Sequence, residues 1–323
     1  MSWRASVSAG ANRALRPFDF QLVRGADIWR PLSKLRTQTA SEGPTAPFSS
    51  PFLKGFRGSR ITSLQEPADF TVLIPTILRS TLVDALQSVF SQRFSGSIQI
   101  IIGIDASKQD TTLVEQICDS IPDRQSVLLF YPGYSTSCRH GGVHISRNDG
   151  SLRTILSYLA NSRYVAYLDD DNWWSDDHLS TMHAQLSAGA DWAYALRWFV
   201  HPGSRQPICH DEWESVGPGR FRKWWGGWVD PNCLAIDKIA CEAALRWWSV
   251  PMTGAKMDSD RNVFRVLSTE FRGAPTGRHS VYYEINETDL MHSYRLSVIG
   301  EERYRSSGEK HSRSGLGEWV GPS

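Results

Sequence analysis

Several features that would assign a specialised class are missing from this chain. Its 323 residues contain no apolar run of the roughly 18 residues that a membrane-spanning helix needs. The five cysteines form no C-x-x-C pair, and their odd number does not suit a disulfide framework. The formal net charge is only +1, so the overall charge does not indicate a nucleic-acid partner. The N-terminus lacks the apolar core of a signal peptide. We therefore expect a cytoplasmic protein.

Charge is nevertheless distributed unevenly. Residues 1–60 contain ten Lys or Arg and only three Asp or Glu. The stretch 37–51 is rich in Ser, Thr, Pro and Gly, which is typical of a linker. The basic segment is either a solvated arm or a peripheral contact with the inner face of a membrane. We expect three parts: a basic arm and linker over 1–65, a folded domain over 66–300, and a polar tail over 301–323.

Apolar runs and helical periodicity alternate from residue 70 onwards. Continuous apolar runs are typical of strands in a parallel sheet, which is buried on both faces, and apolar residues at helical spacing predict the helices between them. Such an alternation indicates an α/β fold with a mostly parallel central sheet flanked by helices. The predicted strands are 70–75, 98–105, 126–131 and 164–168, and the predicted helices are 81–92, 112–121 and a stripe over 152–159.

Three consecutive aspartates, Asp169, Asp170 and Asp171, follow the last of these strands. Ligands of such sheets bind at the carboxyl ends of the strands, where Asp105 also lies at the end of the second strand. The three carboxylates repel one another, so they require a compensating charge. Their hard oxygens suit Mg²⁺ or Mn²⁺, and a phosphate-bearing ligand would complete the coordination shell. The alternative is an acidic loop before a helix that starts near Ser175.

Four segments resemble family 2-type glycosyltransferases with the GT-A fold, in both order and spacing. The resemblance extends from Phe70 to about Leu296 and implies a nucleotide-sugar-binding half over 66–175 and an acceptor half over 176–300. The four segments are 70-FTVLIPT-76, 100-IIIGIDAS-107, 147-RN-148 and 164-YVAYLDDDNWW-174.

The resemblance implies where a nucleotide binds. Asp105 corresponds to the acid that contacts the nucleotide base. Pro75 and Thr76 correspond to the loop that lies against the nucleotide, and Arg147 lies on the same side. The first loop departs from the family, because Ile77-Leu78-Arg79 replaces the commoner Tyr-Asn-Arg.

A metal site is implied in the same way. Asp169 and Asp171 correspond to the D-x-D motif, in which the second acid is the usual metal ligand, and Asp170 is available to the sugar or ribose. His292 corresponds to an additional metal ligand in some GT-A enzymes, although a lone histidine more often has a structural role. The expected cofactor is Mn²⁺ or Mg²⁺.

The segment 224–237, WWGGWVDPNCLAID, resembles the part of the family that closes over the donor sugar. Tryptophan rings stack on the apolar faces of sugars. Trp225, Trp228 and Asp230 are therefore the candidate sugar and acceptor contacts. The alternative is that the tryptophans are packed in the core.

A catalytic base is expected at the start of a helix after this segment. Asp258 and Asp260 both precede an apolar stripe, and the family's Glu-Asp pair is not reproduced, so both are candidates, with Asp260 favoured. Either could instead be a helix N-cap. One base is all that an inverting displacement requires.

Three functions therefore compete. The first is a metal-dependent, inverting glycosyltransferase that uses a nucleotide sugar, most commonly a UDP-sugar, and a glycan or other hydroxyl acceptor. A nucleotidylyltransferase would need a glycine-rich phosphate loop, but residues 75–81 contain no glycine. A carbohydrate-binding relative without activity would not need the acidic triplet together with a downstream acid.

Overall fold

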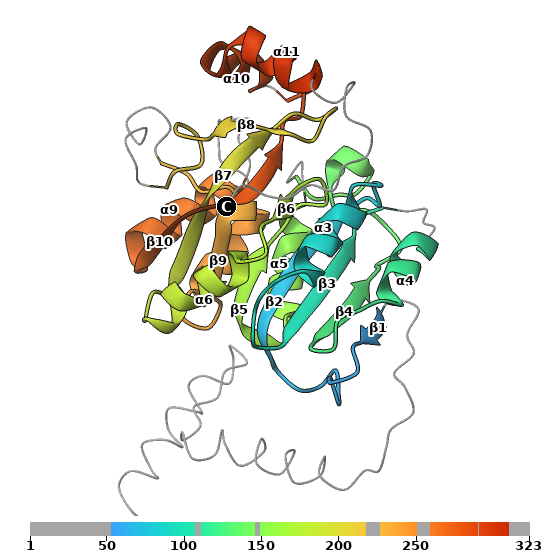
Figure 1. Cartoon of the computed structure of the whole chain (residues 1–323). Helices are drawn as coiled ribbons and strands as arrows, with labels where there is room; N and C mark the ends of the chain where they lie inside the picture. Colours follow the sequence, from blue (N-terminus) through green and yellow to red (C-terminus); the bar gives the residue numbers. More distant parts are fainter. Residues whose placement is uncertain are drawn as a thin grey trace, which may run out of the picture. The chain divides into compact units, whose positions relative to one another are not determined.

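The computed structural model describes residues 53–106, 111–145, 149–217, 227–250, 259–289 and 291–309. Within them a ten-stranded sheet has the order β1-β4-β3-β2-β5-β9-β7-β10-β6, and β8 pairs with β7 (Figure 1). The strands are β1 (Leu53–Arg57), β2 (Ala68–Thr76), β3 (Ile98–Ile104), β4 (Gln125–Phe130), β5 (Ser162–Tyr167), β6 (Trp173–Trp174), β7 (Trp192–Val200), β8 (Pro207–His210), β9 (Leu234–Asp237) and β10 (Gly273–Glu284).

The predicted parallel strands are confirmed for β4, β3, β2 and β5. Beyond β5 the sheet is mixed, because β9 pairs antiparallel with both β5 and β7. β10 then runs parallel to β7. At the other edge, β1 pairs antiparallel with β4, upstream of the boundary expected at residue 66.

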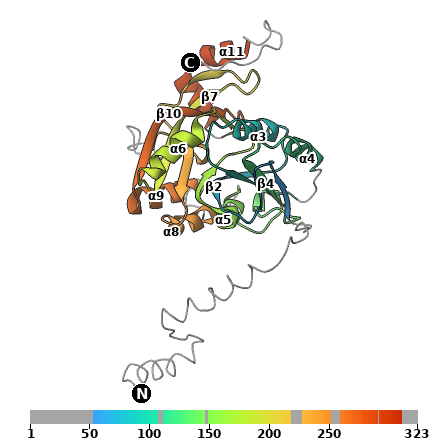
Figure 2. The same ribbon diagram turned by 60° about the horizontal axis from the view of Figure 1, so that its bottom comes forward.

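Helices cover both faces of the sheet (Figures 1 and 2). On one face, the segment that follows α3 meets α6 where Phe94 contacts His183 at 5.2 Å between ring centroids. On the other, α5 and α8 pack against the 3₁₀ helix η5, as does α9. The helices are α3 (Leu82–Phe90), α4 (Thr112–Cys118), α5 (Gly150–Leu159), α6 (His178–Ser187), α8 (Glu242–Leu245), η5 (Arg246–Ser249), α9 (Asp260–Glu270), α10 (His292–Ile299) and α11 (Glu301–Glu309).

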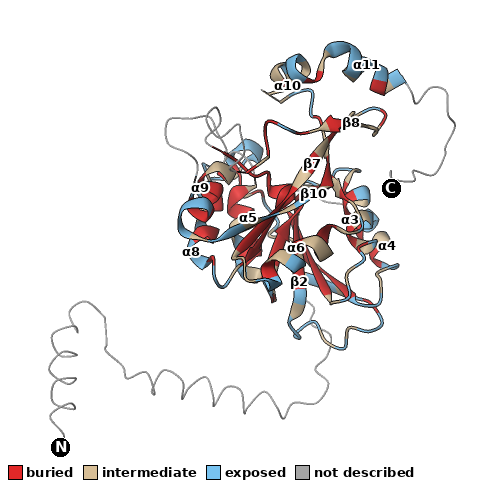
Figure 3. Ribbon diagram, turned by 60° about the vertical axis from the view of Figure 1, so that its left-hand side comes forward, coloured by how far each residue is buried: buried red, intermediate tan, exposed pale blue. Residues whose placement is uncertain are grey.

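Buried residues concentrate on the strands (Figure 3). Every residue of β3 is buried, which explains its continuous apolar sequence. Gly103 in this strand allows α5 to approach closely, because a Cβ there would lie 2.7 Å from Leu156 Cδ1. A second small core, which includes Phe199 and Ile299, joins β7 to α10. None of the helices in the described ranges has the length and apolar character of a membrane-crossing segment.

Candidate active site

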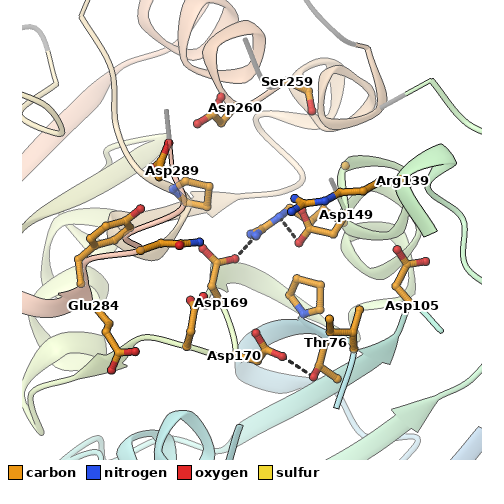
Figure 4. A pocket seen from close by; sticks show the side chains of 18 of the residues that line it. Thr76, Asp105, Arg139, Asp149, Asp169, Asp170, Ser259, Asp260, Glu284 and Asp289 are labelled. Atoms are coloured by element: carbon orange, nitrogen blue, oxygen red, sulfur yellow. Dashed lines mark hydrogen bonds and ion pairs between the residues drawn. The ribbon is translucent and has the colours of Figure 1, made fainter. Parts of the chain in front are cut away.

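A cavity of about 940 Å³ lies at the carboxyl ends of β2, β3 and β5. Its size falls within the usual range of small-molecule sites, roughly 300–1,000 Å³. Residues from both halves of the domain form its walls (Figure 4). The described lining carries nine carboxylates and five arginines, so the cavity has an excess of negative charge.

The predicted nucleotide residues Pro75, Thr76 and Asp105 all line this cavity. Asp105 is buried, and its Oδ1 accepts a hydrogen bond from the Thr136 N–H at 2.5 Å, which ties the loop after β4 to the end of β3. Thr76 Oγ1 donates to Asp170 Oδ2 at 2.6 Å and accepts from the Leu78 N–H. Leu78 has a φ of 64°, a backbone conformation that asparagine adopts more readily than leucine.

Two arginines supply the charge that compensates the acidic triplet. Arg79, from the loop after β2, pairs with Asp171 and lies 3.4 Å from Asp170 Oδ1. Arg153, from α5, pairs with Asp169, and its Nε lies 2.8 Å from Asp149 Oδ2. The acidic-loop alternative does not describe these contacts, because all three carboxylates line the cavity.

The compensation is incomplete at Asp171. Burial in the cavity wall and the neighbouring Asp169 raise the pKa of Asp171 to about 7, against the opposing effect of Arg79. A divalent cation would supply the missing positive charge, and the side chains of Asp169 and Asp171 remain 29% and 30% exposed. These oxygens therefore fit a hard cation. In the described ranges no group of three or more His, Cys, Asp or Glu side chains is arranged to hold a metal, so ligand oxygens would have to complete the shell.

Asn232 holds Asp169 at two points. Its Oδ1 accepts from the Asp169 N–H at 2.6 Å, and its Nδ2 donates to Asp169 Oδ2 at 2.7 Å. The same Nδ2 donates to Asp230 Oδ1 at 2.6 Å, and Asn232 is fully buried. The backbone and the carboxylate of Asp169 are thus both fixed from the acceptor half of the domain.

Asp260 is the first residue of α9 and lines the cavity, as expected for a base at a helix start. Its Oδ2 accepts from the Trp228 indole at 2.7 Å, and its Oδ1 accepts from the Arg261 N–H at 2.7 Å. The N-cap position of α9 is occupied by Ser259 and not by Asp260. Trp228 also lines the cavity but is only 7% exposed, so its main contacts are internal.

The prediction that Asp230 contacts the sugar is not supported by its position. Asp230 is buried outside the cavity lining, and its Oδ2 lies 2.5 Å from Arg197 Nη1. Arg197, in β7, is fully buried and also pairs with Asp211 at 2.9 Å and with Glu214 at 2.5 Å. A buried arginine requires carboxylate partners, which explains why Asp230 lies beside Arg197.

His292 is also absent from the described lining of the cavity. Its ring lies 5.8 Å from the ring of Tyr304, between α10 and α11. Its assignment as a metal ligand stays a prediction. Arg147, Trp225 and Asp258 lie outside the described residues, so their roles stay predictions.

Three residues of the site were missed in the sequence: Arg79, Arg153 and Asn232. Arg153 follows Asp149 by four residues on a helix, a spacing that favours an ion pair and could have indicated it. Arg79 and Asp171 are 92 positions apart, and no local pattern joins them. Asn232 resembles any polar residue of a turn until the fold brings it to Asp169.

A cavity at the strand ends of such a sheet is where α/β proteins bind their ligands, and glycosyltransferases with the GT-A fold share this arrangement. A family model of glycosyl transferase family 2 matches residues 71–234, about half of the chain. The chain therefore belongs to this family.

Comparison with solved structures gives more distant likenesses. Residues 1–349 of TarS from S. aureus share 12% identity with a TM-score of 0.50, over 76% of this chain and 73% of that one. The same TarS fragment in complex with UDP shares 14% identity with a TM-score of 0.49, over 76% and 70%. The mannosyltransferase PcManGT from Pyrobaculum calidifontis, in complex with GDP-Man and Mn²⁺, shares 13% identity with a TM-score of 0.47, over 89% and 73%. No curated protein sequence matches the chain.

Proposed function

We propose that the enzyme transfers a sugar from a nucleotide-sugar donor, a UDP-sugar, to the hydroxyl of a glycan or another acceptor, with inversion at the sugar carbon. The observation that carries the proposal is that one cavity is lined by Asp105, the acidic triplet and Asp260. These residues are separated by up to about half of the chain, and their convergence matches the three tasks of the reaction: nucleotide binding, diphosphate binding and proton removal.

Residues at the ends of β2 and β3 bind the nucleotide in this proposal. Asp105 accepts a hydrogen bond from the base with the carboxylate oxygen that is not committed to the Thr136 N–H. Pro75 and Thr76 form the wall beside it. Arg79 and Arg153 lie close to the aspartates that face the diphosphate, so each can donate hydrogen bonds to phosphate oxygens.

Asp169 and Asp171 would hold Mn²⁺ or Mg²⁺ together with oxygens of the donor. The bound cation would offset the negative charge that develops on the departing diphosphate.

Asp260 acts as the general base. Its carboxylate is oriented by the Trp228 indole and by the Arg261 N–H, which leaves it able to accept the proton of an acceptor hydroxyl. The hydroxyl oxygen then attacks the sugar carbon as the bond to the diphosphate breaks. A single displacement of this kind inverts the configuration.

The first experiment is a thermal-shift screen of nucleotide sugars with and without Mn²⁺. A donor that binds only the folded state raises the apparent stability by about 2.7 kcal/mol at a 100-fold excess over its Kd. Turnover is then compared in wild type, Asp260→Asn and Asp258→Asn. We expect Asp260→Asn to bind the donor normally and to lose about 10²- to 10⁴-fold in transfer rate. Full activity in both variants and in the double variant would refute the inverting mechanism.

The cellular setting is a separate part of the proposal. We propose a cytoplasmic enzyme whose basic segment within residues 1–65 contacts the inner face of a membrane. Co-sedimentation with vesicles that contain anionic lipid tests this contact. We expect binding by the full chain and loss of binding when residues 1–50 are removed.

A further inference from the structure

One arginine of the cavity differs from its neighbours. Arg79, Arg153 and Arg295 each pair with at least one carboxylate. Arg261, at the start of α9, also lines the cavity, but its guanidinium makes no hydrogen bond or ion pair in the part of the chain that the structure describes. Its Nη1 is buried without a partner.

The position of Arg261 is nevertheless fixed. Its guanidinium lies 4.0 Å from the centroid of the Trp228 ring, a stacking distance. The same indole holds Asp260 by a hydrogen bond. Arg261 is therefore presented in a set orientation beside the proposed base, with donors that remain unused.

An unpaired arginine in such a place is costly. Burial lowers the pKa of Arg261, and the nearby carboxylates of Asp260 and Glu214 do not fully offset this effect. Glu214 is already committed to Arg197 and Arg295. A guanidinium carries five N–H donors in a planar fork that matches carboxylate and phosphate oxygens. The missing partner is thus most simply an anion that arrives with a ligand.

The position of Arg261 in the cavity indicates which ligand carries this anion. Figure 4 shows Asp260 across the cavity from Thr76, Asp170 and Asp105, with Asp169 between them. The charges with the largest effect on Arg261 are those of Asp260, Glu214, Arg197 and Asp230, all of which lie in the acceptor half of the domain. Arg261 therefore lies at the end of the cavity that the acceptor enters.

We propose that Arg261 binds an anionic group, a phosphate or a carboxylate, that the acceptor carries near its reacting hydroxyl. The proposal rests on the proposed function, because the role of Asp260 as base defines the acceptor end. A neutral sugar would offer the fork only hydroxyl oxygens, which leave the positive charge uncompensated. An anionic acceptor compensates this charge and is held in register with the base.

The test uses three probes with one carbon skeleton: glycerol phosphate, glycerate and glycerol. Binding is measured on the full chain by calorimetry, with and without saturating UDP and Mn²⁺. Wild type is compared with Arg261→Gln, Arg261→Lys and a matched control, Arg265→Gln. Arg265 is an exposed arginine of the same helix that lies 5.3 Å from the Trp247 ring.

We expect glycerol phosphate or glycerate, but not glycerol, to bind wild type with UDP and Mn²⁺ present. Arg261→Gln should weaken this binding about 10- to 100-fold, the usual effect of losing a charged hydrogen-bond partner. Arg261→Lys should fall between, and Arg265→Gln should match wild type. The unfolding temperature of Arg261→Gln should change little, because the loss of stacking on Trp228 is offset by removal of a buried, unpaired charge.

Equal binding of the anionic probes by wild type and Arg261→Gln would overturn the proposal, as would glycerol binding as well as the two anions. If UDP displaces the probes and Arg261→Gln also loses UDP affinity, the anion is the donor's diphosphate and the assignment to the acceptor is wrong. Failure of wild type to bind UDP at all would count against the proposed function instead. The measurements without UDP would still decide whether Arg261 binds anions.

Discussion

Two clusters in this domain contain the same kinds of side chain, arginine and carboxylate, but differ in their roles. The interior cluster surrounds Arg197, whose side chain is fully buried and whose three carboxylate partners are at most 5% exposed. The rim cluster pairs Arg79 and Arg153 with the acidic triplet, and there Arg79 is 47% exposed. Asn232 connects the two, because it bonds both Asp230 and Asp169.

The difference lies in what else satisfies each carboxylate. In the interior, Asp211 also accepts hydrogen bonds from the N–H groups of Trp213, Glu214 and Ser215, so its partners are fixed by the backbone. At the rim, Asp171 has only side-chain partners: the half-exposed Arg79 from a loop and the amide of the adjacent Asn172. The interior pairs therefore stabilise the fold, whereas a ligand can exchange with the rim pairs.

Loss of Arg197 should give the largest effect. Arg197→Met leaves three buried carboxylates without their shared cation, so we expect the free energy of unfolding to fall by about 3–5 kcal/mol. Urea denaturation measures it. Arg79→Met is the matched control from the rim and should change stability by less than about 1 kcal/mol. Equal losses in the two variants would remove the distinction between the clusters.

Asp171→Ala should act on binding and not on the fold. Because the pKa of Asp171 is raised to about 7, its charge does not stabilise the ligand-free state. We expect the affinity for UDP in the presence of Mn²⁺ to fall about 10- to 100-fold by calorimetry. Asp176→Ala is the control, since Asp176 is an exposed aspartate paired with Arg93. Unchanged UDP and Mn²⁺ binding by Asp171→Ala would show that the metal lies elsewhere.

The positions of the rim carboxylates could be predicted from the sequence better than those of the interior cluster. Continuous apolar runs such as β3 reveal buried parallel strands, and the strand-end rule then places Asp105 and the acidic triplet together. The partners of these acids could not be predicted, because Arg79 meets Asp171 only after β2 and β5 pair. Side-chain type alone also could not separate a sugar contact from an internal one.

Trp228 and Asp230 illustrate that ambiguity. Both were candidates for the sugar, yet the indole of Trp228 holds Asp260, and Asp230 pairs with Arg197. A signal was present in β7, where Arg197 interrupts the apolar run WAYALRWFV. An arginine inside a buried strand must recruit acids from elsewhere in the chain.

Asn232→Ala tests the residue that connects the interior cluster with the rim cluster. Removal of both contacts with Asp169 should weaken UDP and Mn²⁺ binding about tenfold, the lower end for residues that orient metal ligands. Asn262→Ala is the control, because Asn262 is a buried asparagine that donates to the Val250 carbonyl and does not contact Asp169. If both variants lose stability alike but keep full affinity, the role of Asn232 is only structural.

The smallest effect concerns the loop that presents Arg79. Leu78 adopts a positive φ, which costs a non-glycine residue about 1–2 kcal/mol, and asparagine tolerates it better. Leu78→Asn and Leu78→Ala both remove the packing of the leucine. We therefore expect the asparagine variant to be about 1 kcal/mol more stable than the alanine variant in urea denaturation. An alanine variant of equal or greater stability would contradict the assigned strain.

The antiparallel strand β9 has a consequence for synthesis on the ribosome. β5 ends at Tyr167, but its neighbour β9 begins only at Leu234. At about 5–20 residues per second, the edge of β5 waits roughly 3–14 s for its partner. Unpaired strand edges promote aggregation, so during this interval the nascent chain exposes an aggregation-prone edge that a chaperone could cover. β6 waits longer, because its partner residues in β10 are Val281 and Tyr282.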